Sequence, residues 1–185
     1  MKKIAILCAD GFEEIEGLTV VDLLRRADVV CDIVAVGDAS PIVGSHAIRV
    51  LPDRLFKETD FSEYDGIVLP GGLRGTAALA ADGRVETQLR SFCAQGKLTA
   101  AICAAPTVLA QADLLRGKTA VCYPGMEDRL SGAVIGDSDV VEDGTVITSR
   151  GAGTAVPFAL RLVAYLVSEE RAKQLASAIV YDRKP

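Results

Sequence analysis

The chain has 185 residues, half of them hydrophobic, and a formal net charge of −5; these values exclude intrinsic disorder and argue against non-specific nucleic-acid binding. Its five cysteines are an ordinary and odd number for this length, so we expect reduced thiols in a cytoplasmic protein rather than a secreted disulfide framework. No apolar run approaches the roughly 20 residues of a membrane-spanning helix, so no membrane segment is expected.

Short apolar runs alternate with helical patterns along the chain. The pattern predicts buried strands at 4–8, 31–36, 66–69 and 98–103, and helices at 13–26, 73–81, 84–95, 105–115, 154–167 and 169–179. It also predicts a hairpin at 140–148, and either a hairpin or an excursion at the sheet edge at 43–51. Strands that are apolar throughout indicate a sheet covered on both faces. The sequence therefore predicts one α/β domain over residues 1–185, doubly wound, with a mostly parallel sheet and helices on both faces.

In such folds the active site lies beyond the carboxyl ends of the strands. We therefore expect the chemistry at three strand ends, Ala9–Glu16, Pro70–Gly75 and Ile102–Pro106.

Cys103 lies where the fourth buried strand passes directly into a helix, between small residues. Small neighbours allow a tight strand–turn–helix that holds a nucleophile close to the sheet. A helix N-terminus also favours a thiolate, so we expect Cys103 to have a lowered pKa and to be the nucleophile. The alternative is a small buried hydrophobic residue, which is our interpretation of Cys8, Cys31, Cys93 and Cys122.

A carboxylate is the best candidate for the acid–base partner of this cysteine. Glu16 heads a helical row that includes Val20 and Leu23, so the helix directs its carboxyl inward, toward the strand ends. A buried carboxyl has a raised pKa and can exchange a proton with a neighbouring thiol. Glu14 fits an ordinary residue of a first helical turn, and His46, the only histidine, is typical of a surface loop.

The glycine-rich strand end at residues 70–72 has no side-chain chemistry of its own. The N–H groups of Gly72 and Ala104 are candidates for stabilising an oxyanion at this edge of the sheet. The segment Gly-Gly-Leu-Arg-Gly lacks the lysine and hydroxyl residue of a P-loop, and no G-x-G-x-x-G follows the first strand. We therefore expect no nucleotide or other cofactor, and no metal.

Four stretches, in this order and spacing, resemble the ThiJ/PfpI superfamily, in the branch named for the Parkinsonism-associated protein DJ-one and its bacterial relatives. They are residues 11–16, 69–72, 101–106 and 148–154, and the resemblance covers residues 3–182. It implies a flavodoxin-like fold, a homodimer, a reactive Cys103, a carboxylic partner at Glu16, and oxyanion contacts from Gly72 and Ala104.

The chain departs from this family at several positions. Hydrolytic members carry a histidine where this chain has Ala104, which argues against a protease. A histidine near the cysteine in the human branch member corresponds to Tyr123, and an arginine of its middle hairpin corresponds to His46. The first-helix arginine is kept as Arg26. The resemblance implies that Arg26, His46 and Tyr123 line a substrate or anion pocket, whose strength depends on pH through His46.

The resemblance implies a cytoplasmic stress-response enzyme of glyoxalase or deglycase type, which acts on reactive dicarbonyls or early glycation adducts without glutathione. An alternative is an oxidation-sensing protein in which Cys103 becomes a sulfinate beside a protonated Glu16. Another is a redox-regulated chaperone. The enzyme and the sensor use the same two residues, so the sequence alone does not separate them.

The first helix has a second apolar region away from the row of Glu16. Leu18 lies at its centre, with Ile15 and Val21 at its borders. Helices usually bury such a region, and a two-fold partner is the commonest way to do so in an oligomer. We therefore expect a homodimer with this helix in the interface.

Overall fold

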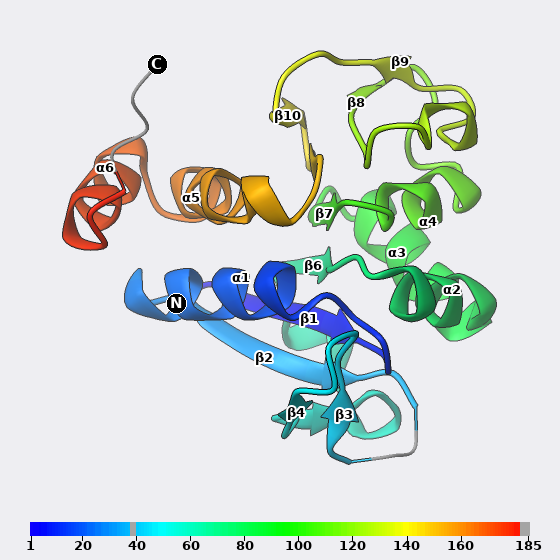
Figure 1. Ribbon diagram of the computed structural model, residues 1–185, viewed down its shortest axis with the longest axis horizontal. Helices are drawn as coiled ribbons and strands as arrows, with labels where there is room; N and C mark the ends of the chain where they lie inside the picture. The colour runs from blue at the N-terminus through cyan, green and yellow to red at the C-terminus, as the bar shows by residue number, and fades with distance from the viewer. Residues whose placement is uncertain (38–39, 182–185) are drawn as a thin grey trace.

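The main sheet of the computed structural model has seven strands; the structure describes residues 1–37 and 40–181 (Figure 1). In chain order the strands are β1 (Lys3–Cys8), β2 (Val30–Ala35), β5 (Arg54–Leu55), β6 (Gly66–Leu69), β7 (Leu98–Ile102), β10 (Val140–Asp143) and β11 (Val146–Ser149). Their order across the sheet is β10-β11-β7-β6-β1-β2-β5. All neighbours pair in parallel except β10 and β11, which form an antiparallel hairpin.

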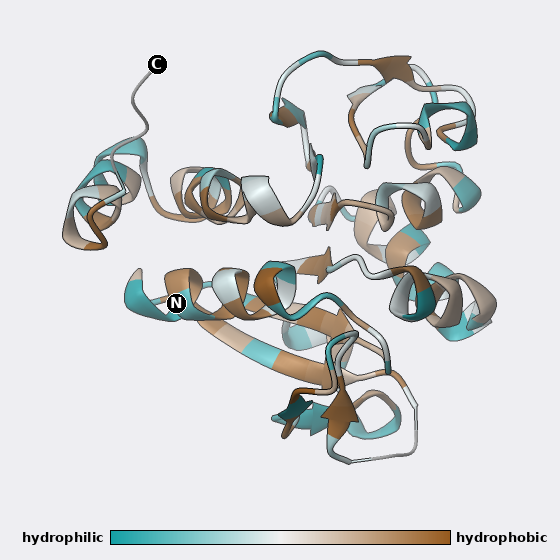
Figure 2. Ribbon diagram, viewed as in Figure 1, coloured by the Kyte–Doolittle hydropathy of each residue, from teal (hydrophilic) through white to brown (hydrophobic). Residues whose placement is uncertain are grey.

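Helices cover both faces of this sheet. One face carries α1 (Glu14–Arg26), α5 (Ala155–Leu166) and α6 (Glu169–Ala178), and the other carries α2 (Leu73–Ala81), α3 (Gly83–Ala94) and α4 (Pro106–Gln111) (Figure 1). Alternate residues of β1 face the two helical layers: Ile4 and Ile6 pack toward α1, and Ala5 and Leu7 toward α2–α4. The central strands are accordingly among the most hydrophobic parts of the ribbon (Figure 2).

The five longer parallel strands lie in the order β2-β1-β6-β7-β11 across the sheet. In chain order, the second strand therefore lies on one side of the first, and the third, fourth and fifth follow on its other side. This is the flavodoxin-like order, and it confirms the predicted doubly wound α/β fold. The direction of winding changes between β1 and β6. Ligands of such folds bind at this switch point, beyond the carboxyl ends of the strands.

The predicted and observed elements differ mainly in the short pieces. The hairpin expected at 43–51 is formed by β3 (Ile42–Val43) and β4 (Arg49–Val50). The sequence pattern missed the two-residue strand β5 and a small separate sheet of β8 (Thr119–Ala120) and β9 (Val134–Ile135). The helix expected at 105–115 ends at Gln111, and Asp113 beyond it is left-handed, with φ 60°.

Four single-turn 3₁₀ helices complete the described part of the chain. They span Phe56–Glu58, Phe61–Glu63, Glu127–Arg129 and Ala152–Thr154. Across the residues that the structure describes, none of the helices has both the length and the apolar character required to cross a membrane.

Candidate active site

Cys103 occupies the turn between β7 and α4, at the carboxyl edge of the sheet. Its backbone is left-handed, with φ 64°, a conformation that residues other than glycine adopt rarely. Its N–H donates to the carbonyl oxygen of Ser149 at 2.9 Å, and its carbonyl oxygen accepts the N–H of Tyr123 at 2.8 Å. These two hydrogen bonds hold the turn so that the half-buried thiol stands at the strand end.

Glu16 projects from the first turn of α1 into the same edge of the sheet and is 1% exposed, as its helical row predicts. Its Oε2 accepts the N–H of Gly71 at 2.8 Å. Its Oε1 is buried without a partner in ordinary hydrogen-bond geometry among the described residues, and the Cys103 thiol is the side-chain group that interacts with the carboxyl. A Cβ on Gly71 would lie 2.6 Å from Oε2 and 2.7 Å from the Cβ of Cys103, so this glycine lets the two side chains meet.

The pKa of the Glu16 carboxyl is raised, as the sequence predicts, but the pKa of the Cys103 thiol is not lowered. Burial raises the pKa of Glu16 to about 7, against the lowering effect of the hydrogen bonds from Gly71 and Cys103. Burial, followed by the charge and hydrogen bond of Glu16, raises the pKa of Cys103 to about 12. The expected lowering of the thiol pKa is therefore wrong: α4 has only six residues, and its start is outweighed by burial and by the neighbouring carboxylate.

The backbone N–H groups of Ala104 and Gly72 lie near the sulfur of Cys103, and both lower its pKa. Gly72 has φ 87°, and a Cβ there would collide with the carbonyl oxygen of Gly11 and lie 2.7 Å from the N of Glu13. Only glycine fits this position without a shift of the neighbouring loop. The structure thus brings Gly72 and Ala104 to the cysteine, at the places where the sequence predicts oxyanion donors.

Tyr123 also lies beside the cysteine. A Cβ on Gly151 would lie 3.5 Å from the ring of Tyr123 and 4.0 Å from the sulfur of Cys103, so the ring and the sulfur flank the same glycine. The side chain of Tyr123 is 52% exposed and is open to a ligand. Tyr123 therefore lies beside the thiol, and its role in a substrate pocket stays a prediction.

His46 contacts Glu14 rather than the thiol pair. Its Nδ1 lies 2.9 Å from Oε2 of Glu14, and its backbone N–H donates to Oε1 of Glu14 at 2.7 Å. Ser45 Oγ donates to Oε2 of Glu14 at 3.0 Å. Burial raises the pKa of Glu14, but these hydrogen bonds outweigh it and lower the pKa to about 2. Glu14 is 4% exposed, so it anchors the β3–β4 hairpin to α1 and is not the ordinary first-turn residue that the sequence suggests.

One group of side chains could hold a metal ion among the residues described. Ligand atoms of Glu13, Glu14 and His46 lie within 4.8 Å of one another. Their mutual hydrogen bonds, and those from Ser45, already satisfy them. These contacts give no reason to infer a metal ion at this place, and the expected absence of a metal and of a cofactor stays a prediction.

Arg26 is not part of this site in the chain, contrary to the expectation from the resemblance. It is the last residue of α1, ten positions after Glu16, which places it about 15 Å away along the helix axis. Its Nε donates to Asp22 at 2.8 Å.

The apolar region expected on α1 is also smaller than predicted. Val21 is 6% exposed and belongs to the core, so only Ile15, at 57% exposed, and the half-buried Leu18 remain on that side.

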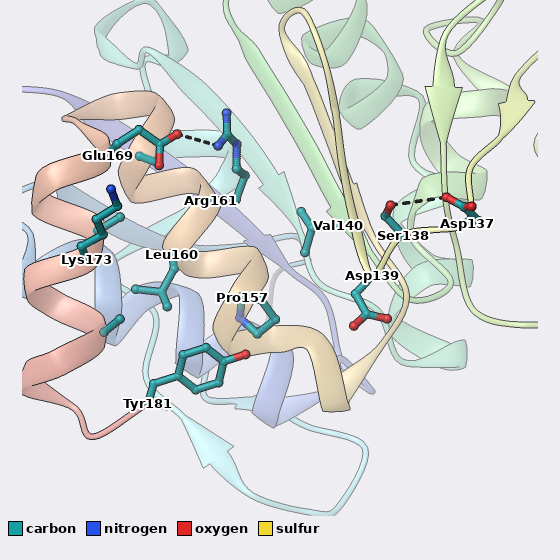
Figure 3. Close-up of a pocket in the computed structure, with 13 residues that line it drawn as sticks. Asp137, Ser138, Asp139, Val140, Pro157, Leu160, Arg161, Glu169, Lys173 and Tyr181 are labelled. Carbon is teal, nitrogen blue, oxygen red and sulfur yellow. Dashed lines mark hydrogen bonds and ion pairs between the residues drawn. The ribbon is translucent and has the colours of Figure 1, made fainter. Parts of the chain in front are cut away.

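A cavity of about 700 Å³ lies away from Cys103, between β10, α5 and α6 (Figure 3). Its walls include Val140, Leu160, Lys173 and Tyr181, and a hydrogen bond joins Arg161 to Glu169 at its rim. A second cavity, of about 420 Å³, lies between α2, α4 and the loop after β8 and is lined by Ala104. The second cavity therefore adjoins the turn that carries the thiol.

The chain matches the model of the DJ-1/PfpI family over residues 2–165. The chain belongs to this family. It is 39% identical to protein DJ-1alpha of Drosophila melanogaster over 100% of this chain and 86% of the relative. It is 33% identical to a deglycase of Pyrococcus abyssi over 82% of this chain and 91% of the relative. A structure of oxidized DJ-1 from Toxoplasma gondii is similar with a TM-score of 0.94 and 34% identity, covering 98% of this chain and 99% of that one.

The family resemblance and the fold that the sequence predicted are thereby confirmed. Within this DJ-1/PfpI chain, the two side chains predicted to react, Cys103 and Glu16, meet at the carboxyl edge of the sheet, beside Gly71, which follows β6. The buried role of Glu14 was missed, and the only signal for it was the Ser45-His46 pair in the hairpin, far away in sequence.

Proposed function

We propose that this protein is a glutathione-independent glyoxalase or deglycase that acts on reactive dicarbonyls or early glycation adducts in the cytoplasm. The observation that carries the proposal is the contact between the Cys103 thiol and the Glu16 carboxyl, with the N–H groups of Ala104 and Gly72 near the sulfur. A nucleophile, a proton acceptor and two oxyanion donors are the groups that this chemistry needs. The deglycase relative of Pyrococcus abyssi supports the same class of activity.

In the proposed reaction, the sulfur of Cys103 attacks the aldehyde carbon of a 2-oxoaldehyde while Glu16 takes the thiol proton. The carbonyl oxygen becomes an oxyanion that the N–H groups of Gly72 and Ala104 stabilise. Glu16 then returns the proton to this oxygen, which gives a hemithioacetal and restores the carboxylate. Glu16 next moves a proton from the aldehyde carbon to the neighbouring carbon through an enediol, which gives a thioester of a 2-hydroxy acid. Water hydrolyses the thioester and restores the thiol, so the net change is the addition of one water molecule to the dicarbonyl.

The test is the formation of lactate from methylglyoxal by the purified protein without glutathione. We expect turnover by the wild type and its loss in Cys103→Ser, whose folding is checked by circular dichroism. Cys93→Ser is the matched control, because Cys93 is a half-buried thiol of α3 outside the site. No lactate from the wild type, or undiminished lactate from Cys103→Ser, would contradict the proposal.

A second candidate function is an oxidation sensor without significant turnover. It is supported by the half-buried thiol beside a carboxyl of raised pKa, which can donate a hydrogen bond to a sulfinate, and by the oxidized DJ-1 structure from Toxoplasma gondii. Two equivalents of peroxide convert the thiol to the sulfinic acid and release two water molecules. Peptide mass spectrometry after graded peroxide favours the sensor if Cys103 gains two oxygens before any other cysteine while methylglyoxal is not consumed.

We also propose that the protein forms a homodimer through α1. Ile15 is exposed and Leu18 is half-buried on one side of this helix, and Val180, at 87% exposed, lies in the same groove region as Thr19 and Arg26. Sedimentation equilibrium should give twice the chain mass of 19.4 kDa, and Leu18→Glu should split the pair. A wild-type mass near that of one chain would rule out the dimer, and a dimer unaffected by Leu18→Glu would place the interface elsewhere.

A further inference from the structure

Three apolar side chains surround the turn that carries the thiol, and the proposed chemistry uses none of them as a reactant. Leu73 is 75% exposed and directly follows Gly72, whose N–H lies near the sulfur. Tyr123 is 52% exposed and flanks Gly151 together with the sulfur. Met126 is half-buried, and its N–H donates to the carbonyl oxygen of Tyr123 at 3.0 Å.

Leu73 and Met126 are brought together by the cavity of about 420 Å³, which they line with Ala104. Ala77 and Ala80 of α2 and Ala110 of α4 extend this apolar wall, and the rest of the lining is polar and includes Asp128 and Arg129. Exposure of large apolar side chains to water is unfavourable, and an apolar ligand that covers them gains free energy of binding. Leu73 and Met126 form the apolar wall of this cavity, and Tyr123 lies outside its lining but beside the sulfur. We call these three residues the apolar rim; they offer a surface for such a ligand next to the reactive turn.

The position of the rim follows from the donors that fix the reacting carbonyl. In the reaction proposed above, the carbonyl oxygen is stabilised by the N–H groups of Gly72 and Ala104, which lie near the sulfur. Ala104, which bears one of these N–H groups, lines the cavity, and so does Leu73, which directly follows Gly72. The substituent on the second carbonyl carbon cannot occupy the space filled by the buried Glu16. It therefore extends toward the exposed side of the site, where the apolar rim lies.

We propose, on the basis of the function proposed above, that the apolar rim binds the substituent of the substrate and makes 2-oxoaldehydes with an apolar or aromatic substituent the preferred substrate class. Such a site discriminates by burial of the substituent: aryl-substituted 2-oxoaldehydes react best, methylglyoxal less well, and glyoxal, which has no substituent, least. Leu73 contributes most to this preference, because its side chain is more exposed than that of Tyr123 and therefore offers more apolar surface for the substituent to cover.

The first experiment measures kcat/KM for phenylglyoxal and for glyoxal and takes their ratio. We expect the ratio to fall roughly ten-fold in Leu73→Ser, the scale on which one apolar contact discriminates between substrates. Leu73→Met should restore most of it, and Tyr123→Ser should lower it by more than Tyr123→Phe. The matched control is Val134→Ser in β9, which removes a side chain 58% exposed outside the rim and should leave the ratio unchanged.

The second experiment needs no turnover. It compares the rates at which phenacyl bromide and bromoacetone alkylate Cys103, a reaction in which the sulfur displaces bromide, with the site read by peptide mass. We expect phenacyl bromide to be favoured in the wild type relative to a free thiol in solution, and this preference to fall several-fold in Leu73→Ser.

The two experiments separate the rim from the proposed function. If no dicarbonyl is turned over but Leu73→Ser still removes the alkylation preference, the proposed function fails and the rim stands. If turnover is present but neither ratio changes in Leu73→Ser or Tyr123→Ser, the inference about the rim is overturned and the proposed function stands.

Discussion

Glu14 and Glu16 stand two residues apart in the first turn of α1, and they meet two different regions of the molecule. Two positions along a helix point to nearly opposite sides, so Glu14 faces the β3–β4 hairpin and Glu16 faces the turn with Cys103. Both carboxyls are buried, yet the pKa of Glu14 is lowered to about 2 and that of Glu16 is raised to about 7.

The difference shows that burial alone does not decide the state of a carboxyl. Glu14 accepts hydrogen bonds from the backbone and imidazole of His46 and from Ser45, and these stabilise its charge. Glu16 accepts one backbone N–H, from Gly71, and otherwise meets a thiol that is a poor donor. The hairpin side therefore holds a fixed charge for structure, and the Cys103 side holds a carboxyl that can change its protonation near neutral pH.

The largest expected effect separates the two carboxyls by activity. Glu16→Gln keeps the shape of the side chain but removes proton transfer, so kcat/KM for methylglyoxal should fall by roughly 10²-fold or more. Glu14→Gln, assayed under conditions where it is folded, should stay within a few-fold of the wild type. Equal losses in the two variants would mean that Glu16 acts only through structure.

The second expected effect separates them by stability, with opposite signs. Each pKa unit corresponds to about 1.4 kcal/mol, so the rise of the pKa of Glu16 from 4.5 to about 7 amounts to about 3 kcal/mol. This contribution is fully present below pH 4.5 and is lost as the pH rises through 7, so Glu16→Gln should lose less stability than the wild type between pH 4 and pH 8.

For Glu14 the pKa is lowered by a similar amount, so its contribution of about 3 kcal/mol is present above pH 4.5 and is lost as the pH falls through about 2. Glu14→Gln should therefore be less stable than the wild type at pH 7 and approach it at low pH. Urea unfolding of both variants from pH 2 to pH 8 measures the two curves. Curves that run parallel to the wild type in both variants would contradict the assigned protonation states.

A third effect sharpens the comparison through the rate of the thiol. Below pH 7 Glu16 is protonated and cannot accept the proton of Cys103, so alkylation of Cys103 by iodoacetamide should rise up to ten-fold per pH unit and level off above about pH 7. Glu16→Gln should remove this rise of the alkylation rate below pH 7 and leave only the rise that comes from the titration of the thiol itself. A wild-type rise near pH 9 would instead indicate a thiol that titrates alone.

The smallest expected effect uses one glycine on each side. A Cβ on Gly71 would press on Glu16 and Cys103, and a Cβ on Gly44 would collide with the carboxyl of Glu14. Overpacking of this kind costs about 1 to 3 kcal/mol. Gly71→Ala should lower kcat/KM by about ten-fold, whereas Gly44→Ala should lower the free energy of unfolding and spare the activity of the folded protein. A loss of activity in folded Gly44→Ala would show that the hairpin side also affects the reaction, and it would contradict the separation of the two regions.

The site of Glu16 and Cys103 could be predicted from the sequence much better than the contact between Glu14 and the β3–β4 hairpin. Glu16 and Cys103 could be found because their roles follow from local order: a helical row that points inward and a strand that ends in small residues. Glu14 could not, because its partner His46 lies 32 positions further on and reaches it only through the tertiary fold. Two-residue strands such as β8 carry too little periodicity to be recognised.

The protonation of the thiol was beyond the sequence for another reason. The lowered pKa expected for Cys103 depends on whether a helix start outweighs burial, and only the packing around the sulfur decides that. Arg26, in contrast, could have been excluded in advance, since ten helical residues already separate it from Glu16.

The left-handed backbone of Cys103 has an energetic consequence for the turn between β7 and α4. A residue with a Cβ stores of order 1 kcal/mol or more in such a conformation, and glycine adopts it without strain. Cys103→Gly would relax the backbone of the turn, but it would also remove the packing of the Cys103 side chain against the core and add the conformational freedom of glycine to the unfolded chain. The turn thus keeps a strained backbone that a cysteine does not need for folding, and strain of this kind is found where a side chain has to be held in one orientation for its chemistry.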